Sequence, residues 1–154
     1  MSQIYALAQN IHRDEFEADD TIVSSRVISG WLANNIGSLN ALLNTEFSGD
    51  SPDWDLEAQA VYHELYLAHY YGKKARNAMN GVIDTTSAGS NIISFKDGDS
   101  EVRFVNSKEV GKELTRMGRQ HRADAVEMAH RYTLHQSTPR QVAGVDGDWL
   151  SGTI

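Results

Sequence analysis

The chain has 154 residues, of which 40% are hydrophobic and 23% are charged, and its formal net charge is −7. This length suits a single domain, and no apolar run approaches the roughly 18 residues that would predict a membrane-spanning helix. Because the sequence contains no cysteine, disulfides and thiolate metal sites are excluded. The N-terminal segment has neither a basic head nor a continuous apolar core, so we expect no secretion signal.

Charge is distributed unevenly along the chain. Residues 1–60 carry 10 acidic and 2 basic side chains, a net of −8, whereas residues 61–154 carry 11 acidic and 12 basic side chains, a net of +1. A molecule with one acidic end suits electrostatic pairing with a neighbouring protein or with another copy of itself.

The N-terminal third is predicted to form two helices joined by an acidic connector. Apolar residues recur at helical spacing from Gln3 to Ile11 and again from about Thr21 to Asn44. Gly30 and Gly37 fall inside the second helix, where each costs about 1 kcal/mol relative to alanine. We therefore expect these two glycines to mark a close approach of another helix.

A long helix from Ser51 to Gly81 is predicted to be the centre of the fold. Ser51 suits the N-cap and Pro52 the first helical position. Its sequence is apolar or aromatic around much of the helix, so we expect other elements to pack on more than one side. One apolar face is formed by Val61, Leu65, Ala68, Gly72, Ala75 and Met79, and a second stripe by Tyr62, Tyr66 and Tyr70.

After the central helix, the spacing of apolar residues changes from a helical period to the alternation of β-strands. Residues 91–105 alternate as in a β-hairpin, with a turn signal at Asp97-Gly98. A final helix is expected over about 107–134, with an apolar seam that only His121 interrupts. We expect His121 to be a core or interface histidine with a hydrogen-bond partner rather than a metal ligand.

The apolar pattern stops after the final helix. Residues 137–154 are predicted to form an extended docking tail, whose apolar end, Trp149, Leu150 and Ile154, packs either on the chain's own core or on a partner. The predicted fold is therefore mostly α: residues 1–136 form a helical bundle with one short β-hairpin, and 137–154 form the tail.

No catalytic motif is complete in this sequence. His63 and His69 are six residues apart, so their side chains point about 240° away from each other on a helix, and a zinc-protease site is rejected. Glu127 and His130 form one Glu-x-x-His pair, but a di-iron bundle needs two. We therefore expect no enzyme, no metal and no cofactor.

Two alternatives from other classes stay open. One is a small helical metal-dependent enzyme that uses Glu64, Glu127, His130 and, as an optional ligand, His121. The other is a non-specific nucleic-acid-binding protein that contacts phosphates. This alternative is based on a basic strip on one face of the final helix. The competing interpretation of the strip is a solvated face whose basic side chains pair with glutamates. The strip consists of Lys108, Lys112, Arg116 and Arg119.

Three stretches together resemble a known family. They are the Ile22–Leu43 helix after its acidic start, the aromatic segment LYLAHYYGKKA at Leu65–Ala75, and FKDGDSEVRF at Phe95–Phe104 with the final helix and tail. This pattern, over about residues 20–145, resembles the helical head–tail connector (adaptor) proteins of tailed bacteriophages, which form a ring beneath the portal.

The resemblance implies a non-enzymatic virion subunit of the neck region, present in the host cytoplasm during assembly. It implies a dodecameric ring that binds the portal above and a neck or tail protein below, and that passes DNA through its lumen without sequence specificity. Partner contacts would come from Arg140, Val142, Trp149, Leu150 and Ile154 of the tail and from Tyr62, Tyr66 and Tyr70. The basic strip would line the lumen or contact another subunit.

Overall fold

The computed structural model describes residues 2–51, 54–80, 92–96, 101–104 and 107–152, with side-chain surroundings for 2–51, 54–80 and 109–136. The described chain is mostly helical, which confirms the predicted class. The elements are α1 (Gln3–Phe16), α2 (Ser25–Leu43), α3 (Leu56–Met79), β1 (Ile92–Lys96), β2 (Glu101–Phe104) and α4 (Ser107–Gly152). No described helix is both long enough and apolar enough to cross a membrane.

Each of the first three helices begins at a side chain that caps it. The hydroxyl of Ser2 accepts from the Tyr5 amide at 3.2 Å, and the hydroxyl of Ser24 caps α2 in the same way. At α3 the carboxylate of Asp55 accepts from the Ala58 amide at 2.8 Å. These bonds satisfy amides that have no partner inside the helix.

The predicted start of α3 at Ser51 is wrong, because Trp54 is held outside the helix. The indole of Trp54 is 6% exposed, and its Nε1 donates to the Ser48 carbonyl at 2.7 Å. Its ring also packs 5.9 Å from that of Phe47. Burying this large side chain holds Trp54 outside the helix, which begins only at Leu56 with Asp55 as its N-cap.

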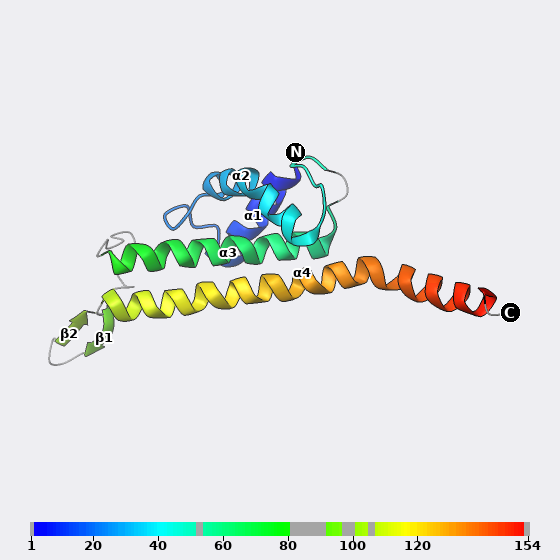
Figure 1. Ribbon diagram of the computed structural model, residues 1–154. Coiled ribbons are helices and arrows are strands. Elements are labelled where there is room, and N and C mark those ends of the chain that lie inside the picture. The colour runs from blue at the N-terminus through cyan, green and yellow to red at the C-terminus, as the bar shows by residue number, and fades with distance from the viewer. Residues whose placement is uncertain (1, 52–53, 81–91, 97–100, 105–106, 153–154) are drawn as a thin grey trace.

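The helices are arranged around α3 (Figure 1). α3 and α4 run antiparallel, side by side, while α1 and α2 pack on the opposite side of α3. This agrees with the expectation that the central helix is covered on more than one side. The core is formed by fully buried apolar side chains of all four helices, among them Ile11, Ile28, Leu32, Leu39, Val61, Leu67 and Ala125.

The tyrosine stripe of α3 belongs to this core. Tyr62 is 0% and Tyr66 is 3% exposed, and the Tyr62 hydroxyl donates to the Leu32 carbonyl of α2. Tyr70 is half-buried, with its ring 4.8 Å from that of Phe16. The prediction that Tyr62 and Tyr66 offer aromatic surface to a partner is therefore wrong, because α1 and α2 already cover them.

The glycines that mark close helix approach are not the ones predicted. A Cβ added at Gly30 or Gly37 would meet nothing within 4 Å, so the expected contact at these positions is absent. The close approach lies between α3 and α4, where a Cβ on Gly118 would come 3.3 Å from the amide nitrogen of Gly72 and 3.4 Å from the Ala68 carbonyl.

The final helix is longer than predicted. α4 has 46 residues, about 69 Å at 1.5 Å per residue, against about 36 Å for the 24 residues of α3. The prediction of an extended tail over 137–154 is wrong up to Gly152, because the backbone of α4 stays helical to that residue; once a helix is nucleated, each further residue extends it at little cost. In Figure 1 the red end of α4 projects beyond α1, α2 and α3.

Two short strands lie within the range predicted for the hairpin. β1 and β2 pair antiparallel, with Phe95 opposite Val102 and Lys96 opposite Glu101. The predicted turn at Asp97-Gly98 lies outside the described residues.

Candidate functional site

The polar junction between α3 and α4 is built around His121. Its Nδ1 lies 2.6 Å from Glu64 Oε2, and its ring stacks on that of Tyr71 with centroids 5.3 Å apart and planes 5° apart. The His121 and Glu64 side chains are 26% and 25% exposed. The part of the prediction that places His121 at a helix interface with a hydrogen-bond partner is therefore confirmed, whereas this contact does not test the part that sets His121 apart from metal ligands.

A third potential ligand joins this pair. Asp124 lies one turn after His121 on α4, and one ligand atom from each of Glu64, His121 and Asp124 lies within 4.8 Å of the other two. Sequence reasoning considered His121 and Glu64 but missed Asp124. The available signal was the His-x-x-Asp spacing, which places both side chains on one face of the helix.

The other two ligands of the predicted metal-enzyme alternative do not join this group. Glu127 is exposed and pairs with Arg131 on its own helix, and His130 is also exposed. Within the part of the chain that the structure describes, Glu64, His121 and Asp124 are the only three such side chains that converge.

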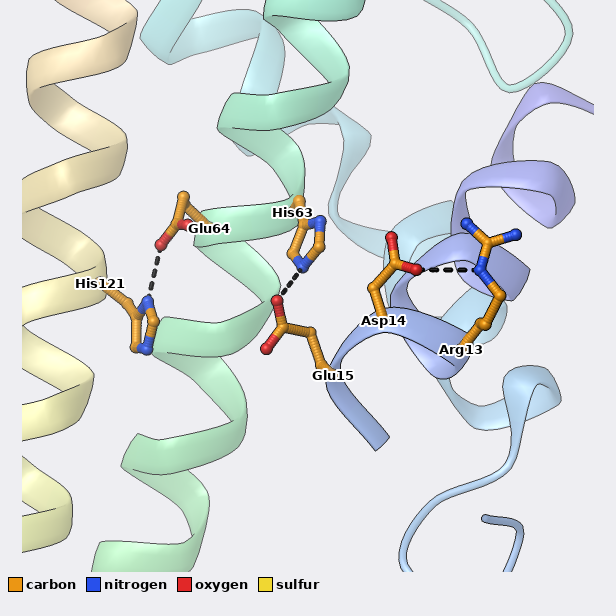
Figure 2. Close-up of polar contacts among 6 residues, drawn as sticks. All are labelled: Arg13, Asp14, Glu15, His63, Glu64 and His121. Carbon is orange, nitrogen blue, oxygen red and sulfur yellow. Dashed lines mark hydrogen bonds and ion pairs between the residues drawn. The ribbon is translucent and has the colours of Figure 1, made fainter. Parts of the chain in front are cut away.

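Other histidines also pair with carboxylates across helices. Figure 2 shows His63 of α3 turned toward Glu15 of α1, on the side of α3 away from His121; the Nε2–Oε1 distance is 2.9 Å. Farther along the α3–α4 contact, His135 Nδ1 lies 3.3 Å from Glu57 Oε2, with both side chains more than half exposed. These pairs have two potential ligands each, unlike the three around His121.

The predicted basic strip is on the surface. Lys112, Arg116 and Arg119 are exposed and line one shallow groove beside Met79. Arg116 is paired with Glu113, with its Nε 3.1 Å from Oε1, and this hydrogen bond lowers the pKa of Glu113. The alternative of a face paired with glutamates therefore holds at Arg116, while the side chain of Lys108 lies outside the described residues.

A second groove crosses α3 between α2 and α4 and gathers three arginines. Arg76 of α3 and Arg119 and Arg122 of α4 line it, and its volume is about 540 Å³. Trp31 and His69 lie at its side, with ring centroids 5.0 Å apart. Burial, followed by the charges of Lys73 and Arg76, lowers the pKa of His69.

The lining of this second groove is basic and apolar. The described residues that line it are Trp31, Asn35, Ser38, Leu65, Ala68, His69, Gly72, Ala75, Arg76, Met79, Thr115, Gly118, Arg119 and Arg122, and none of these is a carboxylate. A groove with this charge suits an anionic group such as a phosphate or a carboxylate.

The predicted partner contacts of the tail fall on the projecting end of α4. We call residues 137–152 the arm. Its backbone is helical, and the side chains of Arg140, Val142, Trp149 and Leu150 lie outside the described residues, as does all of Ile154.

Comparison of the chain with known protein families, with curated proteins and with solved structures finds no match.

Proposed function

We propose that this chain is a structural subunit of a tailed-phage neck, a head–tail connector that assembles as a ring between the portal and the tail. In this proposal the ring is dodecameric, its lumen passes the DNA, and a neck or tail protein binds its lower face. The resemblance of residues 20–145 to adaptor proteins is one support. The observation that carries the proposal is the arm, which projects away from the rest of the chain (Figure 1).

The composition of the arm supports a role in contacting other proteins. It contains Pro139, Gly144 and Gly147 inside its helical range. Relative to alanine, these residues cost a helix about 5 kcal/mol in total, so an isolated helix of this sequence has little stability of its own. Packing against a partner would supply the stability that the local sequence does not provide. The partner in the proposal is the portal or a neighbouring subunit.

The distribution of charge supports a head-to-tail arrangement of subunits. Exposed acidic side chains gather in the N-terminal part, at Glu17, Asp19 and Asp20 after α1. Exposed basic side chains lie on the C-terminal half of α3 and the first half of α4. Contacts between unlike surfaces are heterologous, and heterologous contacts generate closed rings when the rotation between subunits closes.

The basic surface of α3 and α4 supports a contact with polyanions. In the proposed ring, the strip Lys112, Arg116 and Arg119 faces either the acidic part of a neighbour or DNA in the lumen. A DNA contact of this kind would be made through phosphates and would weaken steeply with salt. This is also the observation that favours the second candidate function, a non-specific nucleic-acid-binding protein.

The proposal is tested by mixing the purified chain with the portal protein of the same phage and measuring complex mass by light scattering. We expect the wild-type chain to bind the portal with a defined stoichiometry. Replacing Trp149 and Leu150 by serine should abolish or strongly weaken this complex. Gln141→Ser on the same arm is the matched control and should bind like wild type.

The result that contradicts the proposal is a wild-type chain that stays separate from the portal under conditions in which its helical content is intact. A salt-sensitive complex with DNA but not with the portal would favour the nucleic-acid-binding alternative. Size measurement of the chain alone decides neither, because a connector subunit can stay monomeric until it meets its portal.

A further inference from the structure

We infer that Glu64, His121 and Asp124 form a binding site for a divalent transition-metal ion, which ties α3 to α4. The ligand atoms of these three side chains lie within 4.8 Å of one another. Donors bound to one zinc ion at about 2.0–2.2 Å in a tetrahedron lie about 3.4 Å apart, so small side-chain rotations bring this group to binding distance. This inference does not depend on the proposed function.

The backbone holds the three donors together. His121 and Asp124 are one turn apart on α4, and Glu64 faces them from α3. The two helices are in close contact nearby, since a Cβ on Gly118 would come 3.3 Å from the backbone of Gly72. Ligands supplied by two packed helices are better positioned than ligands on loops.

The imidazole is already oriented. Tyr71 stacks flat on the His121 ring, and Glu64 lies 2.6 Å from its Nδ1. Figure 2 shows this contact bridging the two helices. The stacking and the hydrogen bond already restrain the side chains of His121 and Glu64. An ion that replaced this hydrogen bond would therefore require only small side-chain movements.

The charge of the group also favours a cation. Glu64 has His121 as its polar partner, and Asp124 accepts from Gln120 at 3.0 Å. Among the side chains that the structure describes, no lysine or arginine forms an ion pair with either carboxylate. Glu113 and Glu127, elsewhere on α4, each have an arginine partner. Unlike those two glutamates, the two carboxylates of the site thus have no lysine or arginine partner among the described side chains.

The donor types define the class of ion. One imidazole and two carboxylates, with no thiolate, suit Zn²⁺, Co²⁺, Ni²⁺ or Mn²⁺ better than soft Cu⁺, and Ca²⁺ would require more oxygen ligands. Because Glu64 and His121 are about a quarter exposed, water reaches the site and can complete the coordination sphere.

The test is calorimetric titration of the full chain, freed of metal with a chelator and dialysed, with Zn²⁺ and separately with Co²⁺. We expect one saturable site per chain, with visible d–d absorption for Co²⁺. Asp124→Asn should weaken binding at least tenfold while it keeps the contact of His121 with Glu64 and Tyr71. His121→Ala should weaken it at least as much.

The matched control is His135→Ala. His135 also pairs with a glutamate across α3 and α4, at 3.3 Å, but without a third ligand, so this variant should bind the ion within twofold of wild type. Zn²⁺ should raise the melting temperature of wild type and of His135→Ala but not of Asp124→Asn. The inference is overturned if the wild type shows no saturable binding, or if His135→Ala weakens binding as much as Asp124→Asn does.

Discussion

Replacing Gly30 and Gly37 by alanine should stabilise the protein. Both lie inside α2, and a Cβ at either position would meet nothing within 4 Å. Each change should therefore gain the helix-propensity difference of about 0.8–1.0 kcal/mol without a steric cost. The two sites are about 10 Å apart along the helix and share no contact, so the gains should add to about 2 kcal/mol.

The measurement is urea unfolding of the single and double variants followed by circular dichroism. For a chain of this size, about 2 kcal/mol corresponds to a rise of roughly 4–8 °C in melting temperature. The slope of the free energy against urea should stay unchanged, because the surface exposed on unfolding is the same.

Gly118 provides the opposing control within the same molecule. Its added Cβ would lie 3.3 Å from the Gly72 amide nitrogen, and this is backbone that cannot rotate away. Gly118→Val should therefore destabilise the chain by about 1–3 kcal/mol through overpacking of α3 against α4. The reasoning is refuted if Gly30→Ala and Gly37→Ala lower the free energy of unfolding, or if Gly118→Val raises it.

Three further predictions concern the core, the pH response and the basic strip. Tyr62→Phe should lower the free energy of unfolding by about 1 kcal/mol in the same urea assay, because it removes only the hydrogen bond to α2; an unchanged midpoint would contradict this. Since burial lowers the pKa of His69 below 6.5, the unfolded chain takes up the proton first as the pH falls through 6.5, and stability should drop there. His69→Gln should flatten this part of the stability profile, and an identical profile would exclude the effect. Lys112→Glu together with Arg116→Glu should reduce the slope of log affinity for DNA against log salt by about 1.8, if both contact phosphates; filter binding at several salt concentrations measures this, and an unaltered slope would place the contact elsewhere.

The helices could be predicted from the sequence because their apolar residues follow a period that burial enforces. The central helix was predicted correctly, and so was its packing against other elements on more than one side. It begins, however, four to five residues later than predicted. Periodicity carries no information about Trp54, whose burial against Ser48 and Phe47 delays the helix. Ser51 and Asp55 are both suitable N-cap residues by type, and the burial of Trp54 selects Asp55.

The end of α4 could not be predicted for a different reason. Apolar periodicity is strongest where one face of a helix packs on the rest of the chain. The backbone of α4 continues to Gly152 past Leu134. The prediction interpreted the weaker apolar pattern after Leu134 as an extended segment, although a helix can continue where its periodic signal is weak.

Some residues of the site could be identified from their spacing in the sequence, and others only from the packing of the helices. A hydrogen-bond partner was expected for His121, but Glu64 comes from a position 57 residues away, and only the packing of α3 on α4 identifies it. Asp124 could have been found from its spacing to His121. The burial of Tyr62 and Tyr66 depends on α1 and α2 together, which no pattern within α3 reveals.

The central claim is that other proteins cover the arm. Hydrogen–deuterium exchange of residues 140–152 measures this directly, in the free chain and after addition of the portal protein. The account predicts rapid amide exchange in the free chain and strong protection in the complex, with little change in the buried turns of α3. Exchange of these amides at the same rate with and without the portal would contradict it.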